Sequence, residues 1–237
     1  MNNYKIISLG YNCFIKKFTN DIGINQETNF FDYIGTSMWA INKLFENNFA
    51  NLFNEDDYEN LKIQTDNLIV ITNKHYYFRF LHDFKNNTHI DLIKFNINKK
   101  IDQKIIDDVK LQFYKCKETY ERRIIRLKDL LIKEKKILFI RLEETMHNRI
   151  IYDEYKSYFE KPELDYIIDY SKMIKINYPN LDFKIIYISK IHDNKYMMEN
   201  NLIILNSRDV IIDTWDNCLD GLKDLFRINK EFIDSNL

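Results

Sequence analysis

The run SLGYNC at residues 8–13 places a thiol three residues after the glycine that follows a short apolar segment. Residues Lys5–Leu9 are typical of a strand and Phe14–Phe18 of a helix, and Gly10 permits a sharp turn between them. Cys13 is then expected at the helix N-terminus, where backbone N–H groups and the helix dipole favour the thiolate. Gly10, Asn12 and these N–H groups are candidates for the turn and for part of an oxyanion hole. The alternative is a small buried cysteine in the first helix.

A thiolate nucleophile usually works with a base and an orienting partner. Of the five histidines, His82 in FLHDF is the best placed, because it follows the apolar segment Tyr76–Leu81 and catalytic groups often lie on loops after strands. Asp83 can orient His82 only if the strand has ended, since neighbouring side chains of a strand point to opposite faces. Asp32 is an equally reasonable partner. A structural histidine is the alternative for His82, and the other four look like solvated loop residues: His75, His89, His147 and His192.

Arginines form a second candidate site. Arg122, Arg123 and Arg126 are spaced so that pairs of them share a helix face, and Arg141 ends the next apolar segment. Ligand sites of parallel sheets cluster at such strand ends, and arginines bind phosphate or carboxylate groups with two parallel bonds. The alternative is a solvated face whose cations pair with nearby acidic residues: Glu118, Glu121 and Asp129.

Four short motifs in order carry a family resemblance: SLGYNC, NFFDYIG, FLHDF and ERRIIRL followed by ILFIRLEE. They resemble the motifs SLG-x-x-C, P-F-D-W, H-D-F and an arginine-rich helix leading to F-I-R. These motifs belong to an uncharacterised family of bacterial and viral proteins described as papain-like cysteine peptidases. The resemblance covers the chain from Ile7 to about Arg141.

The resemblance implies a catalytic pair of Cys13 and His82, supported by Asp32 or Asp83. Two positions depart from the family pattern: Phe30 stands at the usual proline and Tyr33 at the usual tryptophan. A papain-like enzyme would place the cysteine helix before an antiparallel sheet that carries the histidine, which gives an α+β fold as the alternative architecture.

The pattern of apolar residues predicts a different arrangement. A long amphipathic helix is expected from Ile106 to Leu131, capped by Asp102, and it leads into a strand at Lys136–Leu142. A second helix, at about Pro162 to Asn177, leads into a second strand at Phe183–Ser189. Helix followed by strand, twice, predicts an α/β fold with a central, largely parallel sheet flanked by helices on both faces. Further strands are expected at Leu68–Thr72, Tyr76–Leu81 and Leu202–Leu205, and a further helix at Met38–Phe49. Loops or small insertions are expected at 143–161 and 190–201.

Composition limits the possible functions. The 237 residues include 35 Lys and Arg against 36 Asp and Glu, a net charge of −1, so we expect no general attraction to nucleic acid or to a membrane surface. The three cysteines are far apart and show no CxxC spacing, which favours reduced thiols over a disulfide framework.

No linker divides the sequence, so one domain over residues 1–237 is expected. No signal peptide is evident, and we expect a cytoplasmic location, in the host if the chain is viral. The abundance of Asn, Ile, Lys and Tyr is typical of an AT-rich genome.

Three functional hypotheses follow. The first is a cysteine-dependent acyl-transfer enzyme, either a peptidase-like hydrolase or an acyltransferase, with Cys13 as nucleophile and His82 as base. The second is a sugar-nucleotide or polysaccharide-modifying enzyme of glycan biosynthesis in which Cys13 is structural, and the third is a non-catalytic binding module. The expected partner is a small-molecule or peptide substrate. No cofactor is required and no metal site is predicted, although acyl-CoA or a nucleotide sugar as substrate would give the arginines a purpose. The oligomeric state is open.

Overall fold

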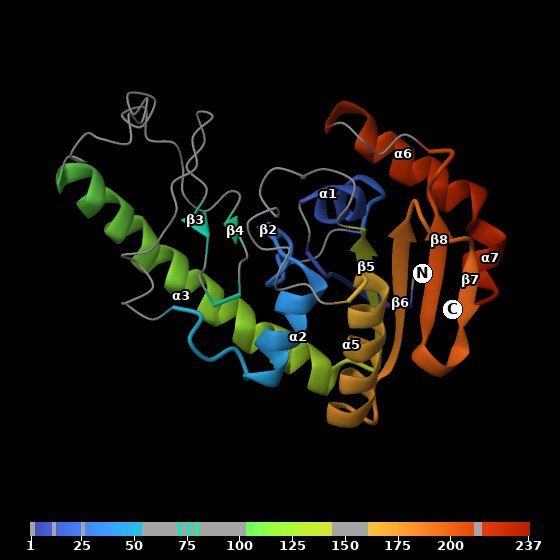
Figure 1. Ribbon diagram of the computed structural model, residues 1–237, viewed down its shortest axis with the longest axis horizontal. Coiled ribbons are helices and arrows are strands. Elements are labelled where there is room, and N and C mark those ends of the chain that lie inside the picture. Colours follow the sequence, from blue (N-terminus) through green and yellow to red (C-terminus); the bar gives the residue numbers. More distant parts are fainter. Residues whose placement is uncertain are drawn as a thin grey trace.

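The computed structural model describes residues 3–10, 13–24, 27–53, 71–72, 75–76, 79–80, 103–143, 161–210 and 215–237. Its main feature is a five-stranded sheet in the order β1-β5-β6-β8-β7 (Figure 1). The strands are β1 Lys5–Ser8, β5 Lys136–Leu142, β6 Asp182–Ser189, β8 Leu202–Asn206 and β7 Lys195–Met197. The first four run parallel and only β7, at the edge, is antiparallel. The predicted α/β fold with a largely parallel sheet is therefore confirmed.

The central strands are buried on both faces. Ile137 and Phe139 of β5 belong to one apolar cluster, while Leu138 and Ile140 belong to the other. Continuous apolar runs are typical of parallel strands covered by helices on both sides. This explains why the run KILFIRL forms a strand with the bounds expected from the sequence.

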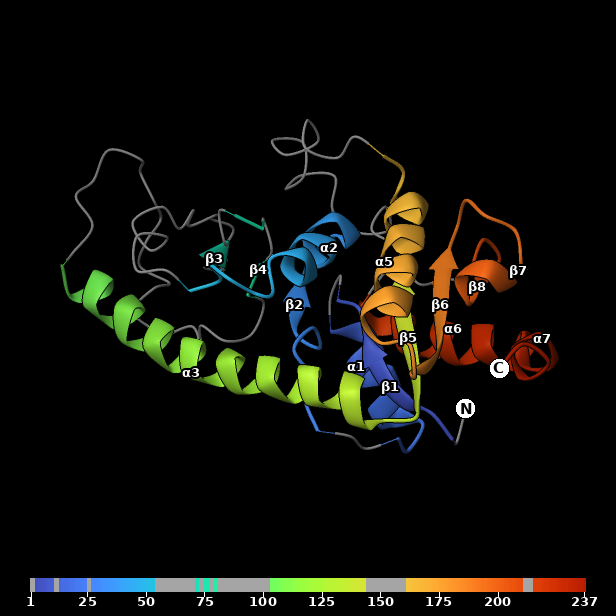
Figure 2. The ribbon, with the colours of Figure 1, turned by 90° about the horizontal axis from the view of Figure 1, so that it is seen from below.

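Helices cover each face. Apolar residues of α2 Met38–Glu46, α3 Gln103–Lys133 and α5 Glu163–Asn177 pack in the first cluster. Residues of α1 Phe14–Asp21, α6 Trp215–Ile228 and α7 Lys230–Asp234 pack in the second. Figure 2 shows α2 and α5 on one side of the sheet and α6 and α7 on the other.

A small second sheet lies away from the large one (Figure 1). It has the order β2-β4-β3, with β2 Ile34–Gly35, β4 Arg79–Phe80 and β3 Ile71–Thr72, all antiparallel. The expected strands at 68–72 and 76–81 are described only at these short stretches. The expected cap Asp102 and the expected loop at 143–161, except for Glu143 and Lys161, lie outside the described residues.

Three expectations need correction. The helix α2 ends at Glu46 rather than at Phe49, because Asn48 and Phe49 adopt positive φ and the Phe49 amide bonds back to the carbonyl of Leu44. The segment 190–201, expected to be a loop, contains β7 and a 3-10 helix, η4 Met198–Asn200. The helices α6 and α7 were not expected.

Candidate functional site

The described residues at the two ends of the β1–α1 junction, Leu9, Gly10 and Cys13, agree with the predicted turn from strand to helix. The Leu9 amide still bonds to the Ile140 carbonyl at 2.9 Å, which extends the pairing with β5, and the chain then turns at Gly10. Gly10 has φ +72°, and a Cβ there would lie 2.4 Å from Thr36 Cγ2. Only glycine fits this turn, because its backbone conformation strains other residues and its Cα faces Thr36 closely.

Cys13 occupies the N-cap position of α1, as the sequence predicted. The thiol is fully buried, and burial raises its pKa, while Lys17 and the cysteine's own backbone N–H act in the opposite direction. The expected activation by the helix N-terminus is therefore outweighed by desolvation, because a thiolate in an apolar environment is costly. In this conformation Cys13 holds its proton at neutral pH, so any attack on a substrate needs a partner that removes the proton.

A buried ion pair lies beside this junction. The Asp32 carboxylate accepts a hydrogen bond from the Asn29 amide at 2.7 Å, and Lys16 Nζ lies 3.8 Å from it. Both charged side chains are almost completely buried. Burial raises the pKa of Asp32 to about 6, although the Asn29 amide, Lys16 and Arg123 all lower it. The pair therefore joins α1, which begins after Cys13, to the turn that carries Asp32.

The pKa of Tyr33 responds to both Asp32 and Cys13. Burial raises the pKa of its hydroxyl, and the charges of Asp32 and Cys13 raise it further. The turn at residues 29–33 therefore lies beside α1, the helix that begins after Cys13.

The proposed base lies outside the described residues, as do Asp83 and Asn12. The described chain nevertheless approaches the site, because Phe80, the last residue of β4, pairs with Ile34 of β2. Ile34 directly follows the turn that carries Asp32 and Tyr33, and its own amide bonds to the Phe31 carbonyl of that turn. The first residue of FLHDF, Phe80, therefore lies beside the residue that follows the Asp32 turn.

The arginines of α3 have separate partners. Arg126 donates to the Thr28 carbonyl at 2.8 Å and pairs with Glu27 at 3.3 Å. The Arg123 guanidinium lies 4.6 Å from the Tyr120 ring centre and acts on the charge of Asp32. Arg122 is exposed and lies 3.5 Å from the Thr119 hydroxyl. Arg126 therefore packs on residues 27–28, and Arg123 acts electrostatically on Asp32. The predicted binding of an anion by these arginines stays a prediction.

Arg141 has an internal role that the sequence did not suggest. Its side chain is fully buried; Nε donates to Glu163 at 2.7 Å, and Nη1 donates to the carbonyls of Leu9 and Thr36 at 2.9 and 2.7 Å. Nη2 also lies 2.5 Å from the Glu163 carboxylate. Arg141 was expected to bind an anion at the end of its strand. This expectation is wrong, because α5 and the segments at Leu9 and Thr36 cover the side chain.

Sequence reasoning also missed two polar groups. Lys16 was not singled out, since nothing in the sequence distinguishes it from Lys17, which is exposed. Glu143, just after β5, is buried and accepts hydrogen bonds from the Tyr187 hydroxyl, the Ser189 hydroxyl and the Lys190 amide at 2.9–3.2 Å. Its position at the carboxyl end of a parallel strand was the available signal.

The described ranges also limit which other kinds of site are present. These ranges contain no group of three or more His, Cys, Asp and Glu that could hold a metal ion. They also contain no helix with the length and apolar character needed to span a bilayer. The three cysteines Cys13, Cys116 and Cys218 are all free thiols.

An α/β sheet with a cysteine at the first strand-to-helix junction, beside a buried aspartate, suits a cysteine-dependent hydrolase. The chain belongs to the family described as "Putative papain-like cysteine peptidase", whose model matches residues 4–193. This match confirms the resemblance expected from the motifs. No curated protein and no solved structure is significantly similar to the chain.

Proposed function

We propose that the chain is a cysteine-dependent acyl-transfer enzyme that uses Cys13 as nucleophile, His82 as base and Asp32 as the group that orients the base. The observation that carries this proposal is that Cys13 is the N-cap of α1 and that Lys16 of the same helix forms a buried ion pair with Asp32. Membership of the family supports cysteine-dependent hydrolysis at a coarse level. Peptidase action, acyl transfer and the identity of the base are our proposals.

The burial of Cys13 gives the base a defined task. Because burial raises the pKa of the thiol, His82 must take the proton as sulfur attacks the carbonyl carbon of the substrate. The C–S bond forms, the leaving amine or alkoxide receives the proton from His82, and a thioester remains. Water then releases the acid, or an amine or hydroxyl acceptor takes the acyl group.

We favour Asp32 over Asp83 as the orienting group. Phe80, two residues before His82 in the sequence, pairs with Ile34, the second residue after Asp32. Asp32 is also held by the Asn29 amide and by Lys16, which fix the carboxylate in place. A fixed carboxylate can keep an imidazole in one tautomer and stabilise the cation that forms.

The test is the rate of alkylation of each thiol, measured against pH by mass spectrometry. Cys218 is an internal control, because it is buried to the same extent as Cys13 but lies within α6. General-base catalysis contributes about 10²–10⁴-fold, so Cys13 should react at least about tenfold faster than Cys218. His82→Ala should remove that difference and leave Cys116 and Cys218 unchanged. Equal rates for Cys13 and Cys218 in the wild-type chain would overturn the proposal.

The raised pKa of Cys13 favours one alternative, in which the cysteine is structural and the chain modifies a sugar nucleotide or a polysaccharide. Arg123 and Arg126 beside the segment 27–33 would then bind the diphosphate. A panel of UDP- and GDP-sugars, titrated by isothermal calorimetry, tests this reading. Binding that Cys13→Ala retains and Arg126→Ala loses would support it, and no binding by any member of the panel would contradict it.

A further inference from the structure

Lys16 is a buried lysine on the helix that follows Cys13. Cys13 is the N-cap of α1, and Lys16, three residues further on, exposes only 6% of its side chain. Its neighbour Lys17 is exposed, as most lysines are. A lysine is almost never fully buried unless its charge is paired. The burial of Lys16 therefore points to a partner for the ammonium group.

The partner is Asp32, in the turn at residues 29–33. Lys16 Nζ lies 3.8 Å from Asp32 Oδ2, and the side chain of Asp32 is only 2% exposed. The same oxygen accepts a hydrogen bond from the Asn29 amide at 2.7 Å. A buried carboxylate is costly unless it is paired and hydrogen-bonded, and this one has both kinds of contact. Asp32 is thus held from α1 on one side and from its own turn on the other.

A second cation acts on Asp32 from α3. Burial raises the pKa of Asp32, and the charge of Arg123 is one of the contacts that lower it. The Arg123 guanidinium lies 4.6 Å from the centre of the Tyr120 ring, which meets the ring of Phe30 edge-on at 5.4 Å. Within the described residues, the charged and titratable groups that act on Asp32 come from three elements: Lys16 from α1, Arg123 from α3 and Tyr33 from the turn itself.

The charge of Asp32 depends on a balance between burial and these contacts. Burial favours the protonated form and raises the pKa of the carboxyl group, whereas the Asn29 amide, Lys16 and Arg123 lower it, so that it lies at about 6. The carboxylate is then mostly ionised at pH 7, and the ionised form is the one that stabilises an imidazolium. An opposite charge within about 4–6 Å lowers the pKa of an aspartate by about 1–3. Without Lys16, Asp32 would therefore be about half protonated or more at pH 7.

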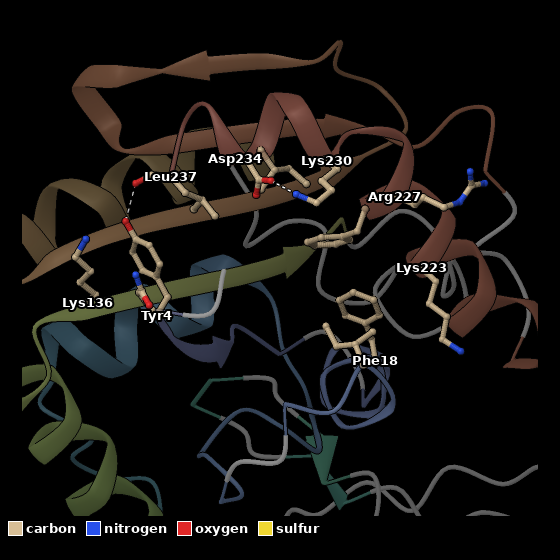
Figure 3. A pocket seen from close by; sticks show the side chains of 12 residues that line it. Tyr4, Phe18, Lys136, Lys223, Arg227, Lys230, Asp234 and Leu237 are labelled. Atoms are coloured by element: carbon tan, nitrogen blue, oxygen red, sulfur yellow. Dashed lines mark hydrogen bonds and ion pairs between the residues drawn. The ribbon is translucent and has the colours of Figure 1, made fainter.

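The other end of α1 is fixed independently of this ion pair. Phe18 and Phe226 of α6 have ring centres 4.8 Å apart. Asp21 forms an ion pair with Lys223 of α6. Figure 3 shows Phe18 and Lys223 at this end of the two helices. Because α6 holds the second half of α1, we expect a substitution at Lys16 to change the local charge more than the position of the helix.

We propose that Lys16 is a positioning residue of the acyl-transfer site: its buried ammonium keeps the Asp32 carboxylate ionised and in place at neutral pH. The ionised carboxylate then orients His82, which takes the proton of Cys13. The Lys16–Asp32 pair thereby sets the lowest pH at which the thiol is activated. The role of Asp32 in catalysis rests on the proposed function, whereas its charge can be measured without it.

The first measurement is the titration of the Asp32 carboxyl carbon by carbon-13 NMR, with the signal assigned from Asp32→Asn. Lys16→Met keeps most of the length of the side chain and removes its charge, and it should raise the pKa of Asp32 from about 6 to at least about 7. Lys16→Gln, which can still donate a hydrogen bond, should also raise it and is the second variant if Lys16→Met does not fold. Lys16→Arg should leave the pKa at about 6, because it restores the cation.

Two controls separate charge from stability. Lys17→Met removes a charge from the next residue, which lies exposed on the same helix. Burial raises the pKa of Cys13 and Lys17 lowers it, so this variant should raise the pKa of the thiol and leave that of Asp32 unchanged. Phe18→Leu loosens α1 against α6 and should reduce the free energy of unfolding without changing the pKa of Asp32.

The second measurement is the rate of Cys13 alkylation by iodoacetamide against pH. When the pKa of Asp32 rises from about 6 to about 7, its ionised fraction at pH 6 falls from about one half to about one tenth. We therefore expect Lys16→Met to react about fivefold more slowly than wild type at pH 6, and Lys16→Arg to react at nearly the wild-type rate. Above about pH 8 the rates should converge, because Asp32 is then ionised in both chains.

Three outcomes would overturn the proposal: an unchanged pKa of Asp32 in both Lys16→Met and Lys16→Gln, an equal rise in Lys17→Met or Phe18→Leu, or a raised pKa of Asp32 with an unchanged pH profile of Cys13 alkylation.

Failure of the proposed function gives a different pattern. Cys13 would then react no faster than Cys218 in the wild-type chain, while the pKa of Asp32 would still rise in Lys16→Met. The catalytic role of Lys16 would be lost with the proposed function, and its control of the Asp32 charge would remain.

Discussion

Replacing Arg141 with methionine tests whether this arginine holds the β1–α1 junction in place. The side chain joins β5 to Glu163 in the first turn of α5 and to the carbonyls of Leu9 and Thr36. Leu9 directly precedes the turn at Gly10, and Thr36 packs on that turn. Methionine keeps much of the length and apolar volume but removes the charge and every donor.

The expected loss follows from what the substitution leaves behind. Glu163, whose side chain is only 13% exposed, would lose its cation, and two buried carbonyls would lose a donor. Removing one partner of a buried ion pair costs about 3–5 kcal/mol. We therefore expect the free energy of unfolding to fall by about that amount, a large part of the 5–15 kcal/mol typical of a domain.

Equilibrium urea unfolding, followed by far-ultraviolet circular dichroism, measures this loss. The matched control is Arg227→Met, because Arg227 pairs with Asp224 in solvent and surface substitutions usually change stability by less than about 0.5 kcal/mol. Arg141→Met with Glu163→Met should be more stable than Arg141→Met alone, since no unpaired carboxylate remains. A loss below about 1 kcal/mol for Arg141→Met, or a double variant less stable than the single, would refute the reasoning.

Two further perturbations test the junction and the Asp32 pair. Gly10→Ala should destabilise the fold by more than Gly23→Ala. Both glycines have positive φ, but only at Gly10 would a Cβ meet another atom, Thr36 Cγ2, and strain of this kind costs about 1–3 kcal/mol. Equal losses of the free energy of unfolding in urea would contradict the steric argument. Burial raises the pKa of Asp32 from 3.8 to about 6, so the folded chain binds this proton more tightly than the unfolded chain. The stabilisation is fully present below about pH 4, is lost as pH rises to about 6, and amounts to about 3 kcal/mol. Asp32→Asn should remove that part of the pH dependence, and parallel stability curves for wild type and variant between pH 4 and 7 would show that Asp32 does not titrate there.

The central strands could be predicted because they are buried on both faces and read as continuous apolar runs. The strand β5 has the bounds expected from KILFIRL, and the stripe from Ile106 to Leu131 lies within α3. The edge strand β7 was missed, since Lys195 is exposed, the other two residues are only partly buried, and the three form no apolar run. The helix α6 had a usable signal in the helical spacing of its buried residues: Cys218, Leu222, Leu225 and Phe226.

The candidate site could be predicted in position but not in electrostatics. Local sequence placed Cys13 at the start of a helix, because a strand, a glycine and an apolar helix follow one another. The pKa of the thiol depends instead on how completely the rest of the fold buries it, and burial is the largest cause of its shift. Arg141 illustrates the same limit, since its partners Leu9 and Thr36 are remote in sequence.

The strand order also has a consequence for the order of folding. The strands β5, β6 and β8 are joined by short connections through α5 and β7, whereas β1 pairs with β5 across more than half of the chain. Closing a long loop costs more chain entropy than closing a short one, and contacts distant in sequence form slowly. We expect the carboxyl-terminal strands to assemble first and β1 to dock late. Because Cys13 follows β1 directly, the thiol would then become buried among the last events of folding, and until that point it would be open to oxidation.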